Sequence, residues 1–575
     1  MNAENLLEHY ARISEAPDAI TRLRRFVLDL AVRGKLVEQD AADEPGSGLL
    51  KRIMAEKAKL GINRRPNVDG VTDLPFDLPR GWALSSIGEV CSKTGSGSTP
   101  RGGKEVYADN GVPFLRSQNI YDDGLRLDDV ALISAEIHER MSGTAVKPAD
   151  LLLNITGGSM GRCCRILDDF NEANVSQHVA IIRPAITGMS DFLHRLVLST
   201  YFQAFIFGEQ TGAGRGGLPK NRMDRIAVAL PPIAEQHRIV AKVDELMALC
   251  DRLEEARTAR EAVRDRLTAA SLARLTAPDT TAADFQSHAR FAMKSLPTLT
   301  TRPDQIKTLR QTILNLAVRG KLVAQDAGNA PAAELLKRIA KEIAGKRKEM
   351  GLRPNTALQP IENDDAPFDL PRGWAWARFP EVGVFARGKS KHRPRNDLAL
   401  YADGNVPFLQ TGDVARSGGN IKTHSAVYNS TGLAQSLLWP AGTMCITIAA
   451  NIADSGIMTF DACFPDSVVG LVVASQFENA RFFEYFVRTA KANLTEFAPA
   501  TAQKNINLGI LEMVLIPLPP LAEQHRIVAK VDALMDLCDR LEASLTQADT
   551  TRQRLLAALL HEALDPVAKE LEAAE

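Results

Sequence analysis

Residues 383–390 (GVFARGKS) are a candidate for nucleotide chemistry, because they fit the phosphate-loop pattern G-x-x-x-x-G-K-[ST]. In that motif a helix begins directly after the loop, so that its N–H groups face the phosphates. Here Pro394 would interrupt such a helix in its second turn. The matching residues 91–98 of the first half of the chain lack the pattern. We therefore expect no nucleotide site, and keep a nucleotide-driven enzyme as an alternative.

Two further motifs also lack the surrounding elements or ligands that their chemistry requires. Residues 212–217 (GAGRGG) fit G-x-G-x-x-G, but they follow a predicted helix and precede a predicted strand, the reverse of the dinucleotide-binding order. His237 and His525 recur inside the string AEQHR without other ligands at metal-binding spacing. We interpret the first motif as a loop and the histidines as part of a solvated first helical turn.

Catalytic signatures are missing from the sequence. There is no DPPY or NPPF loop of amino-methyltransferases and no G-x-S-x-G elbow, and Pro465-Asp466 is not followed by the [DE]-x-K of a nuclease core. The seven cysteines form no C-x-x-C pair, which argues against structural zinc and a disulfide framework and fits a reducing compartment. We expect a chain without a catalytic site, metal or cofactor of its own.

Local charge is the remaining chemical signal. The formal net charge is −1, so any nucleic-acid surface has to be local. Acid-free basic stretches mixed with amide and hydroxyl residues occur at matching places in both halves, and such loops suit DNA because cations hold phosphates while amides and guanidinium groups read base edges. They comprise Lys93, Arg101 and Lys104 with Arg387, Lys389, Lys391, Arg393 and Arg395, and Arg215, Lys220, Asn221, Arg222 and Arg225 with Lys504, Asn505 and Asn507. Ordinary solvated surface is the alternative interpretation.

The elements that would position these loops are duplicated along the chain. Residues 75–83 (PFDLPRGWA) recur unchanged at 367–375, and residues 230–254 recur at 518–542 with 22 of 25 positions identical. Residues 30–37 and 49–53 recur at 316–323 and 335–339. About 150 residues between the Gly-Trp and Leu-Pro-Pro blocks have diverged, although 107–115 still resembles 401–409. The repeated blocks form a shared frame, which indicates two equivalent docking places for one kind of partner. The diverged segments between them indicate two different targets.

The frame is expected to be helical. Residues 4–60 and 305–350 read as helices with a break at Gly34 in the first copy, and a long helix of about 60 Å starts after Pro232 and again after Pro520. Apolar residues at alternating spacings of 4 and 3 form a coiled-coil seam on each long helix. The seam residues are Ile239, Val243, Leu246, Cys250 and Leu253, and Ile527, Val531, Leu534, Cys538 and Leu541. We favour mutual packing of the two seams; the alternative is that each helix packs on its own domain.

We therefore expect an α+β protein in which two mixed α/β domains are joined by long antiparallel coiled-coil helices, with a pseudo-two-fold internal repeat. Strands are expected at 179–183 and 226–230, and helices at 192–203 and 479–490. The expected boundaries are a helical region at 1–75, a first α/β domain at 76–232, a long helix at 233–275, a linker at 276–304, a second helical region at 305–366, a second α/β domain at 367–520, a long helix at 521–565 and a tail at 566–575.

Targeting signals do not alter this picture. Residues 1–20 are acidic and lack the apolar core of a signal peptide, and runs such as 468–474 are too short to span a bilayer. We expect a cytoplasmic protein.

The arrangement resembles the specificity subunits of type I restriction–modification systems over nearly the whole chain. The resemblance rests on residues 23–37 (LRRFVLDLAVRGKLV), 78–82 (LPRGW), 112–116 (VPFLR), 230–239 (LPPIAEQHRI) and their second copies. It implies that each diverged segment is a target recognition domain that reads one half of a split, asymmetric DNA site, while the helices set the gap. It also implies two copies of an adenine methyltransferase subunit, bringing S-adenosylmethionine, and a motor–nuclease subunit that uses ATP and Mg.

The resemblance transfers no base contacts, so the DNA-binding candidates rest on composition and loop position. In the first domain they are Arg101, Lys104, Arg116, Gln118, Asn119, Lys220, Asn221 and Arg222, and in the second Lys389, Arg393, Arg395, Gln410, Lys504, Asn505 and Asn507. Arg116 and Gln410 follow the shared Pro-Phe-Leu block and differ in chemistry, as expected of a reading position. A twin-domain scaffold that binds proteins or a membrane surface is the alternative function.

Overall fold

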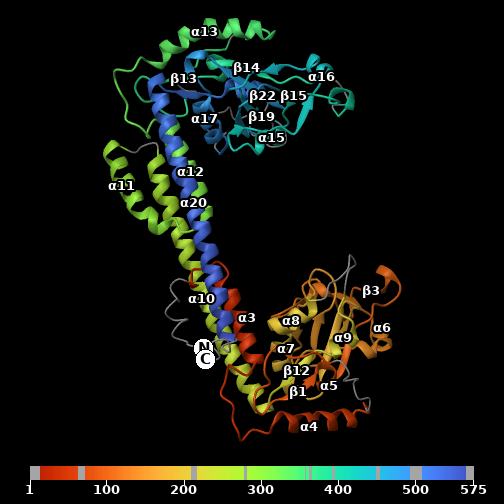
Figure 1. Cartoon of the computed structure of the whole chain (residues 1–575). Helices are drawn as coiled ribbons and strands as arrows, with labels where there is room; N and C mark the ends of the chain where they lie inside the picture. The colour runs from red at the N-terminus through yellow and green to blue at the C-terminus, as the bar shows by residue number, and fades with distance from the viewer. Residues whose placement is uncertain are drawn as a thin grey trace, which may run out of the picture. The chain divides into compact units, whose positions relative to one another are not determined.

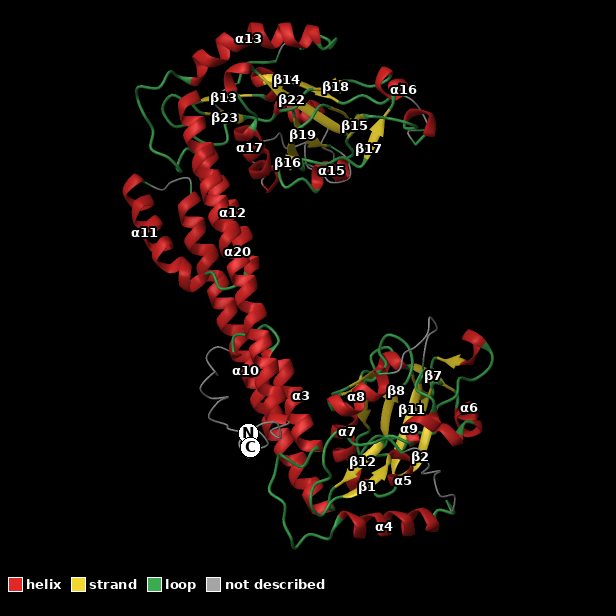
Figure 2. Ribbon diagram, in the orientation of Figure 1, coloured by secondary structure: helices red, strands yellow, loops and turns green. Residues whose placement is uncertain are grey.

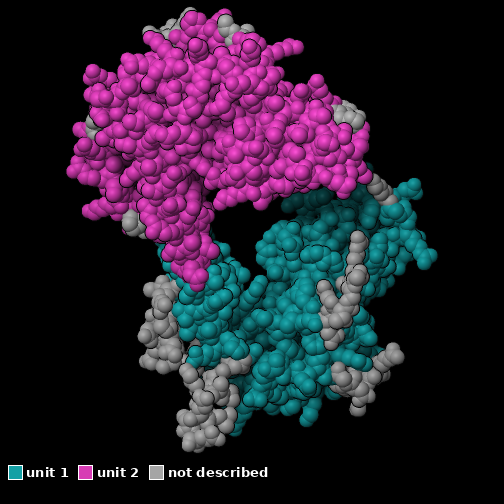
Figure 3. Space-filling model, turned by 45° about the horizontal axis from the view of Figure 1, so that its top comes forward, with its two compact units in different colours: residues 1–260, 549–575 teal, residues 261–548 magenta. Residues whose placement is uncertain are grey.

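The computed structural model describes residues 13–62, 71–208, 217–277, 281–355, 358–361, 366–391, 394, 396–448, 453–492 and 508–564 (Figure 1). The chain divides into two compact units, of which unit 1 comprises residues 1–260 with 549–575 and unit 2 comprises residues 261–548 (Figure 3). Within each unit the strands gather in one α/β domain and the helices form a frame (Figure 2). None of the described helices is long and apolar enough to cross a membrane.

The frame of each unit is built from equivalent helices. In unit 1 they are α3 (Ala19–Val32), α4 (Gly46–Lys59) and the first part of α10 (Ile233–Thr276). In unit 2 they are α12 (Pro303–Val318), α13 (Ala332–Glu349) and the first part of α20 (Leu521–Leu564). The helical regions that the sequence predicts at 305–350 and after both Leu-Pro-Pro blocks are thereby confirmed.

The seam residues are buried in the first turns of both long helices. Ile239 and Val243 belong to the apolar cluster that contains Val27 and Leu28 of α3, and Ile527 belongs with Val531 to the cluster around α12. In these turns the seams therefore pack within their own half, which was the alternative to the mutual packing that the sequence favoured. Cys250 and Cys538 are buried as well, as expected of small core residues, whereas Leu541 is 37% exposed.

The last turns of each long helix belong to the other unit. Leu556 and Leu560 of α20 lie in a cluster with Phe26 of α3, within unit 1. Leu272 and Leu275 of α10 lie in a cluster with Leu316 of α12, within unit 2. Helix α10 thus starts in unit 1 and α20 in unit 2, so the two helices connect the units in opposite senses. This confirms the long antiparallel helices of the predicted fold.

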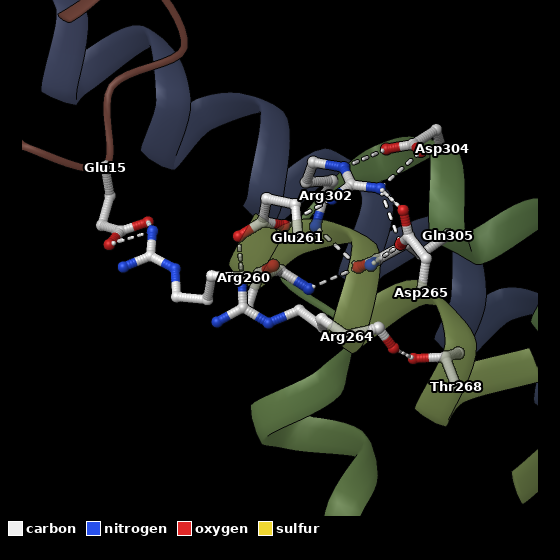
Figure 4. A network of polar contacts seen from close by, with 10 residues as sticks. Glu15, Arg260, Glu261, Arg264, Asp265, Thr268, Arg302, Asp304 and Gln305 are labelled. Atoms are coloured by element: carbon white, nitrogen blue, oxygen red, sulfur yellow. Dashed lines mark hydrogen bonds and ion pairs between the residues drawn. The ribbon is translucent and has the colours of Figure 1, made fainter. Parts of the chain in front are cut away.

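Arg302, at the start of α12, ties α12 to the last part of α10 in unit 2 (Figure 4). Its guanidinium pairs with Asp265 at 2.8 Å and Asp304 at 3.0 Å, and it also pairs with Glu261. Gln305 donates to the Asp265 carboxylate at 2.8 Å. These groups are partly exposed, so each pair contributes little free energy. Together they connect the first turn of α12 to the last part of α10.

Residues 276–304 differ from the predicted linker, because they contain helix α11 (Ala282–Leu299). The Thr281 side chain caps its first turn by accepting a bond from the N–H of Asp284 at 3.2 Å. Phe285, Ala289 and Ala292 recur at spacings of 4 and 3 and join the cluster of Leu272 and Leu275. The Ala- and Thr-rich composition concealed this short amphipathic stripe.

The domain of unit 1 contains two four-stranded sheets. The first has the order β2-β11-β8-β9 and is antiparallel, and the second has the order β10-β4-β7-β3. Strand β11 carries an almost uninterrupted buried run because both of its faces are covered. The bounds are β2 (Cys91–Ser96), β3 (Tyr107–Ala108), β4 (Val112–Leu115), β7 (Ala131–Ile133), β8 (Leu151–Asn154), β9 (Cys163–Arg165), β10 (Asn174–Val175) and β11 (Val179–Pro184), with β5 (Ile120–Tyr121) and β6 (Gly124–Leu125) forming a separate hairpin.

The domain of unit 2 repeats this plan. Its sheets have the orders β14-β22-β19-β20-β16 and β17-β15-β21-β18, and the parallel pair β15–β21 matches β4–β10. The two diverged segments therefore share one fold. The bounds are β14 (Gly383–Arg387), β15 (Val406–Phe408), β16 (Asn420–Ile421), β17 (Ala426–Tyr428), β18 (Leu438–Trp439), β19 (Met444–Thr447), β20 (Ser455–Met458), β21 (Ala462–Cys463) and β22 (Val468–Val473).

Helices cover the main sheets where the sequence predicts them. Helices α7 (Ser190–Leu198) and α8 (Thr200–Phe207) occupy the predicted 192–203 region, and α17 (Arg481–Ala492) occupies the predicted 479–490 region. Helix α8 is anchored to the frame, because the buried carboxylate of Asp29 in α3 accepts a bond from the N–H of Thr200 at 2.9 Å. The remaining short α-helices of the described residues are α5 (Ile87–Val90), α6 (Ala135–Arg140), α9 (Lys220–Asp224), α14 (Phe379–Val382), α15 (Thr411–Ala415), α16 (Ser430–Ala434) and α19 (Leu508–Met513).

His194 of α7 makes unit 1 sensitive to acid. Its ring is buried, its Nε2 donates to the carbonyl of Cys163 at 2.9 Å, and burial lowers its pKa from 6.5 to about 4. In the unfolded chain this imidazole is protonated near pH 6.5, whereas in the folded chain it stays neutral until about pH 4. The free energy of unfolding should therefore fall as the pH drops from 6.5 to 4. We expect a loss of up to about 3 kcal/mol, measured as urea unfolding of the chain between pH 7 and pH 4.5. A His194→Gln variant should show a flatter pH dependence, and an unchanged slope would contradict the assignment.

Candidate nucleic-acid interface

Each α/β domain is joined to its long helix by a small closed neck. In unit 1, β1 (Ala83–Ser86) pairs antiparallel with β12 (Ala227–Leu230), which places both ends of the domain side by side. The indole Nε1 of Trp82 donates to the carboxylate of Glu235 at 3.0 Å, and both side chains are buried. Burial raises the pKa of Glu235, and the indole bond partly offsets this. The Gly-Trp and Leu-Pro-Pro blocks are thus the two sides of one joint.

The second neck has the same parts. Strand β13 (Ala375–Ala377) pairs with β23 (Ile516–Leu518), and the buried Trp374 lies next to the buried Glu523. The glutamine that follows each glutamate turns back to a proline carbonyl, since Gln236 donates to Pro231 at 3.0 Å and Gln524 donates to Pro519 at 2.9 Å. The glutamate and glutamine of the repeated AEQ string therefore stabilise the necks.

Glycine is required where the frame meets the neck. Gly34 and Gly320 have φ of +66° and +65°, in the left-handed region that side chains disfavour. A Cβ on Gly34 would also lie 2.7 Å from Pro79, and one on Gly320 would lie 2.6 Å from Pro371. The helix break that the sequence predicts at Gly34 is confirmed. Gly34 lies against Pro79 and Trp82 of the Leu-Pro-Arg-Gly-Trp block.

Four loops of the first domain meet at one end of its main sheet. The N–H of Gly97, after β2, donates to the carbonyl of Val179 at 2.8 Å. The N–H of Ile155, after β8, donates to the carbonyl of His178 at 3.0 Å, and the N–H of Leu218, before α9, donates to the carbonyl of Ile155 at 3.0 Å. The loops at 97–101, 155–161, 176–178 and 217–222 are thereby held together, and we refer to them as the loop platform.

The loop platform of the first domain presents donors and acceptors without carboxylates. Its exposed side chains include those of Ser98, Thr99, Gln177 and His178, and no Asp or Glu occurs in its four loops. The Thr156 hydroxyl contacts Nδ1 of His178 at 2.7 Å and so fixes the orientation of the ring. Such a surface can face phosphates and base edges without charge repulsion.

A close approach of two backbones holds the loop platform in place. A Cβ on Gly97 would lie only 2.0 Å from the carbonyl oxygen of Val175, so no other residue fits there. In the second domain a Cβ on Gly388 would lie 2.3 Å from the carbonyl oxygen of Phe464. Both glycines follow the first strand of the main sheet, which makes the backbone of the platform common to the two domains.

The second domain repeats the loop platform with different side chains. The N–H of Gly388 donates to Val468 at 2.9 Å, and the N–H of Ile448 donates to Ser467 at 3.0 Å, as Gly97 and Ile155 do to Val179 and His178. Ladder positions then match Ser98 with Lys389, Gln177 with Asp466 and His178 with Ser467. Equal backbones with unlike side chains are the geometry expected of two readers with two targets.

The residues after the Pro-Phe-Leu block border the loop platform through Asn154. The Nδ2 of this buried asparagine donates to the carbonyl of Ser117 at 2.9 Å and to the hydroxyl of Ser159 at 3.1 Å. The short helix η2 (Ser117–Asn119) therefore lies against the β8–β9 loop. Gln118 is exposed there and Arg116 is half-buried, so both candidates stand at the platform.

Asn119, predicted as a DNA-reading residue, is bonded within the domain instead. It is 3% exposed, its Oδ1 accepts from the N–H of Arg116 at 3.0 Å, and its Nδ2 donates to the carbonyl of Arg126 at 2.9 Å. Its amide is consumed in holding the chain turn, so this candidate is corrected to a positioning residue. In the second domain Asp413 does the same for Gln410, accepting from its N–H at 2.9 Å, and leaves the Gln410 side chain exposed.

The other predicted residues are placed as follows. Arg101 and Asn221 are exposed, Arg222 lies 6.0 Å from the ring centre of Phe205, and Lys389 is exposed on the second platform. Lys220 is partly tied down, since its Nζ lies 2.5 Å from Thr94 and 2.6 Å from Asp224. Lys104 belongs to the 3-10 turn η1 (Gly103–Val106), and its side chain is outside the description. Arg393, Arg395, Lys504, Asn505 and Asn507 lie outside the described residues, as does the 212–216 part of the glycine loop.

Sequence reasoning missed Thr156, Gln177 and His178. They belong to no charge cluster, and Thr156 lies 21 residues before the adjacent pair Gln177 and His178, so no linear spacing links the three. Only the ladder that pairs β8 with β11 brings their loops together. The weak signal that the sequence did contain is the position of each loop at a strand end.

The nucleotide and metal alternatives find no support in the geometry. Gly383–Arg387 forms strand β14, and the described residues after it, 388–391, continue as a loop rather than a helix, with Gly388 pressed against Phe464. His237 is exposed, with Nε2 3.3 Å from the carbonyl of Gly188. No group of three His, Cys, Asp or Glu side chains suited to a metal occurs in the described part of the chain.

A cleft of about 1060 Å³ in unit 1 is charge-balanced and is therefore a poorer DNA surface than the loop platform. Arginines and aspartates both line it, and they pair across it: Arg24 with Asp251 at 2.6 Å, and Arg195 with Asp244 at 2.6 Å. Such pairs cancel the positive potential that a phosphate backbone requires. Of these pairs, Arg195–Asp244 joins α7 of the domain to α10 of the frame.

The chain is similar in sequence to several known proteins. The family model described as "Type I restriction modification DNA specificity domain" matches residues 79–260 and 371–548. The type I restriction enzyme EcoAI specificity subunit of Escherichia coli is 28% identical over 569 residues, covering 95% of this chain and 94% of that protein. The EcoEI specificity subunit of Escherichia coli is 26% identical with the same coverage. A crystal structure of the HsdS subunit from Thermoanaerobacter tengcongensis aligns with a TM-score of 0.41 at 19% identity, covering 85% of this chain and 98% of that one.

Proposed function

Because the chain belongs to the type I restriction modification DNA specificity family, we propose that it is the sequence-reading subunit of a type I restriction–modification complex. Each α/β domain is a target recognition domain and reads one half of a bipartite, asymmetric DNA site. The long helices set the unread gap. The chain is not an enzyme: it directs adenine methylation and ATP-dependent cleavage that partner subunits perform.

One observation supports the division of labour between the domains, namely the loop platform that occurs twice with one backbone and two sets of side chains. A scaffold for two identical proteins would gain nothing from having Gln177 and His178 in one domain and Asp466 and Ser467 at the equivalent positions of the other. A reader of two different half-sites needs such differences, because base edges are distinguished by the pattern of donors and acceptors.

The partners follow from membership of the family. The complex contains DNA, methyltransferase subunits and a restriction subunit, with S-adenosylmethionine, ATP and Mg on those subunits. Two methyltransferase copies are proposed here because the helical frame is present twice. The methyltransferase would flip the target adenine out of the duplex, and the recognition domains would hold the flanking sequence in register.

The function is tested by reconstituting the chain with its methyltransferase subunit and sequencing the methylated adenines of exposed genomic DNA. We expect methylation at one split site and duplex binding that weakens steeply with salt. A complex that binds no duplex and methylates no split site would refute the proposal. Retained binding to a protein or membrane without DNA binding would instead favour the scaffold.

The loop platform predicts separable effects on the two half-sites. Gln177→Ala with His178→Ala should weaken recognition of the first half-site by about 1–3 kcal/mol while the second half-site is still read as before. The matched control is Asp466→Ala with Ser467→Ala, at the equivalent positions of the second domain. Methylation rates on oligonucleotides with single changes in either half measure the effect, and a pair of variants that disturbs both halves equally would contradict the assignment.

A further inference from the structure

Helix α13 of unit 2 is about one turn longer than its counterpart α4 in unit 1. The two helices begin at equivalent positions of the repeat, Ala332 and Gly46, but α13 has 18 residues and α4 has 14. The last turn of α13 contains the string KRK at residues 346–348. The extension therefore adds positive charge to one copy of the repeated frame.

The added turn reaches strand β14, which ends at the second loop platform. Nη1 of Arg347 donates to the carbonyl of Phe385 in β14 at 2.9 Å. Phe385 lies three residues before Gly388, the glycine that follows the strand, and this spacing corresponds to about 10 Å of strand. Helix α13 and strand β14 are in contact and lie next to each other in Figure 2. Arg347 thus holds the end of the helix beside the platform.

In unit 1 the frame helix is bonded to its domain further from the loop platform. Nζ of Lys57 in α4 donates to the carbonyl of Gly88 at 2.8 Å, and Gly88 lies nine residues before Gly97. Ser96 directly precedes Gly97, as Arg387 directly precedes Gly388 in the second domain. The added turn and Arg387 therefore distinguish the second domain from the first.

Three side chains near the second loop platform form a surface that we call the basic band. They are Lys346, Lys348 and Arg387; the last two are exposed and the first is half-buried. None of the three has an ion pair with another described residue. Lys389 continues the positive surface on the platform itself. Segments 346–348 and 387–389 together contain five cations and no acid.

The carboxylate of Glu512 in α19 lies beside the basic band. Burial raises the pKa of Glu512, and the nearby charges of Arg347 and Arg387 act in the opposite direction. One carboxylate thus lies near both guanidinium groups, which agrees with the ends of α13 and β14 being neighbours. Its charge and that of Glu349, which follows the KRK string, are outnumbered by the five cations of the two segments. The surface is therefore positive.

We propose that the basic band binds the sugar–phosphate backbone of the duplex next to the second half-site, as a contact that holds the DNA without reading its sequence. This inference rests on the proposed function. Cations in a last helical turn also offset the helix dipole, which accounts for Lys346 and Lys348 but not for Arg387 on a strand. Phosphates are the DNA groups that lysine and arginine bind whatever the sequence. At 3.4 Å per base pair, 10 Å along β14 corresponds to about three base pairs from the bases at the platform.

The test measures the affinity of the reconstituted complex for a duplex with the methylated split site, by fluorescence anisotropy at several salt concentrations. Lys348→Gln with Arg387→Gln should weaken binding about tenfold near physiological salt and lower the slope of log Kd against log salt by about 2. Specific and non-specific duplexes should be weakened by the same factor, and the methylated sequence should stay the same. Lys346→Gln with Lys348→Gln, which leaves the strand unchanged, should act in the same direction.

The matched control is Lys337→Gln with Arg338→Gln, which removes the same charge from exposed positions near the start of α13 and should change neither affinity nor slope. Neutral methylphosphonate linkages beside the second half-site should weaken binding by the unaltered complex but not weaken the Lys348–Arg387 variant further. An unchanged salt slope, or a changed methylated sequence, would overturn this inference alone. An unaltered complex that binds no duplex would refute the proposed function and this inference with it.

Discussion

A chain in which residues 376–517 are replaced by a second copy of residues 84–229 should direct methylation to a split site whose two halves are identical and inverted. The exchange is geometrically simple because the two necks are equivalent: Ala83 pairs with Leu230 in the first, and Ala375 pairs with Leu518 in the second. Each segment therefore begins and ends at the strands of its own neck. The halves should be inverted because α10 and α20 connect the units in opposite senses. Methylation of the original site should fall at least about 100-fold, since each mismatched base pair costs about 1–3 kcal/mol.

The measurement is sequencing of methylated adenines in genomic DNA treated with the reconstituted complex. The control keeps the natural second domain and replaces residues 84–229 by the corresponding segment of a related specificity subunit, which should change the first half-site alone. If either exchange altered both halves of the site, the domains would not be independent readers, and the modular interpretation of the loop platforms would be wrong.

Trp82→Ala should detach the first recognition domain from its frame. The indole is buried against Phe192 with ring centres 6.2 Å apart, and it is bonded to Glu235. Removing a buried tryptophan costs about 3–5 kcal/mol, and a glutamate left buried without its donor adds to the loss. We expect unit 1 to unfold at lower denaturant concentration and methylation to lose dependence on the first half-site.

Trp374→Ala is the matched variant of the second neck, and it should act on the second half-site. Glu235→Gln retains an acceptor for the indole, so it should retain most of the stability and the first half-site. Because burial raises the pKa of Glu235, the neutral amide is the closest available substitute. If Glu235→Gln were as damaging as Trp82→Ala, the hydrogen bond would not be the element that closes the neck.

The sequence predicted the frame well because its signals are local or repeated. The 4 and 3 spacing of the seams, the prolines before both long helices and the identical blocks gave the long helices and the two-domain plan. The predicted strands at 179–183 and 226–230 are β11 and β12. Helix α11 was missed, because only Phe285, Ala289 and Ala292 mark its buried side within an otherwise linker-like composition.

The site was predicted less well, and the reason is physical. The loop platform is assembled by hydrogen bonds between segments far apart in the chain, such as Ile155 with His178, and composition does not report such pairings. Charge drew attention to Lys220, whose ammonium is engaged with Asp224, and loop position drew attention to Asn119, whose amide is bonded inside the domain. The partner of each seam was likewise decided by the tertiary structure, since helical spacing identifies a buried stripe but not what covers it.

The glycines at the root of the loop platforms have a consequence for how new specificities arise. Gly97 and Gly388 approach the backbone of a neighbouring segment directly, so replacing an exposed side chain such as that of Ser98 or Gln177 leaves these contacts in place. Substitutions at such positions usually shift stability by less than about 0.5 kcal/mol. A lineage of these proteins can therefore change the DNA sequence that it recognises by point mutation, without first acquiring compensating changes. Its DNA targets should diversify much faster than its fold.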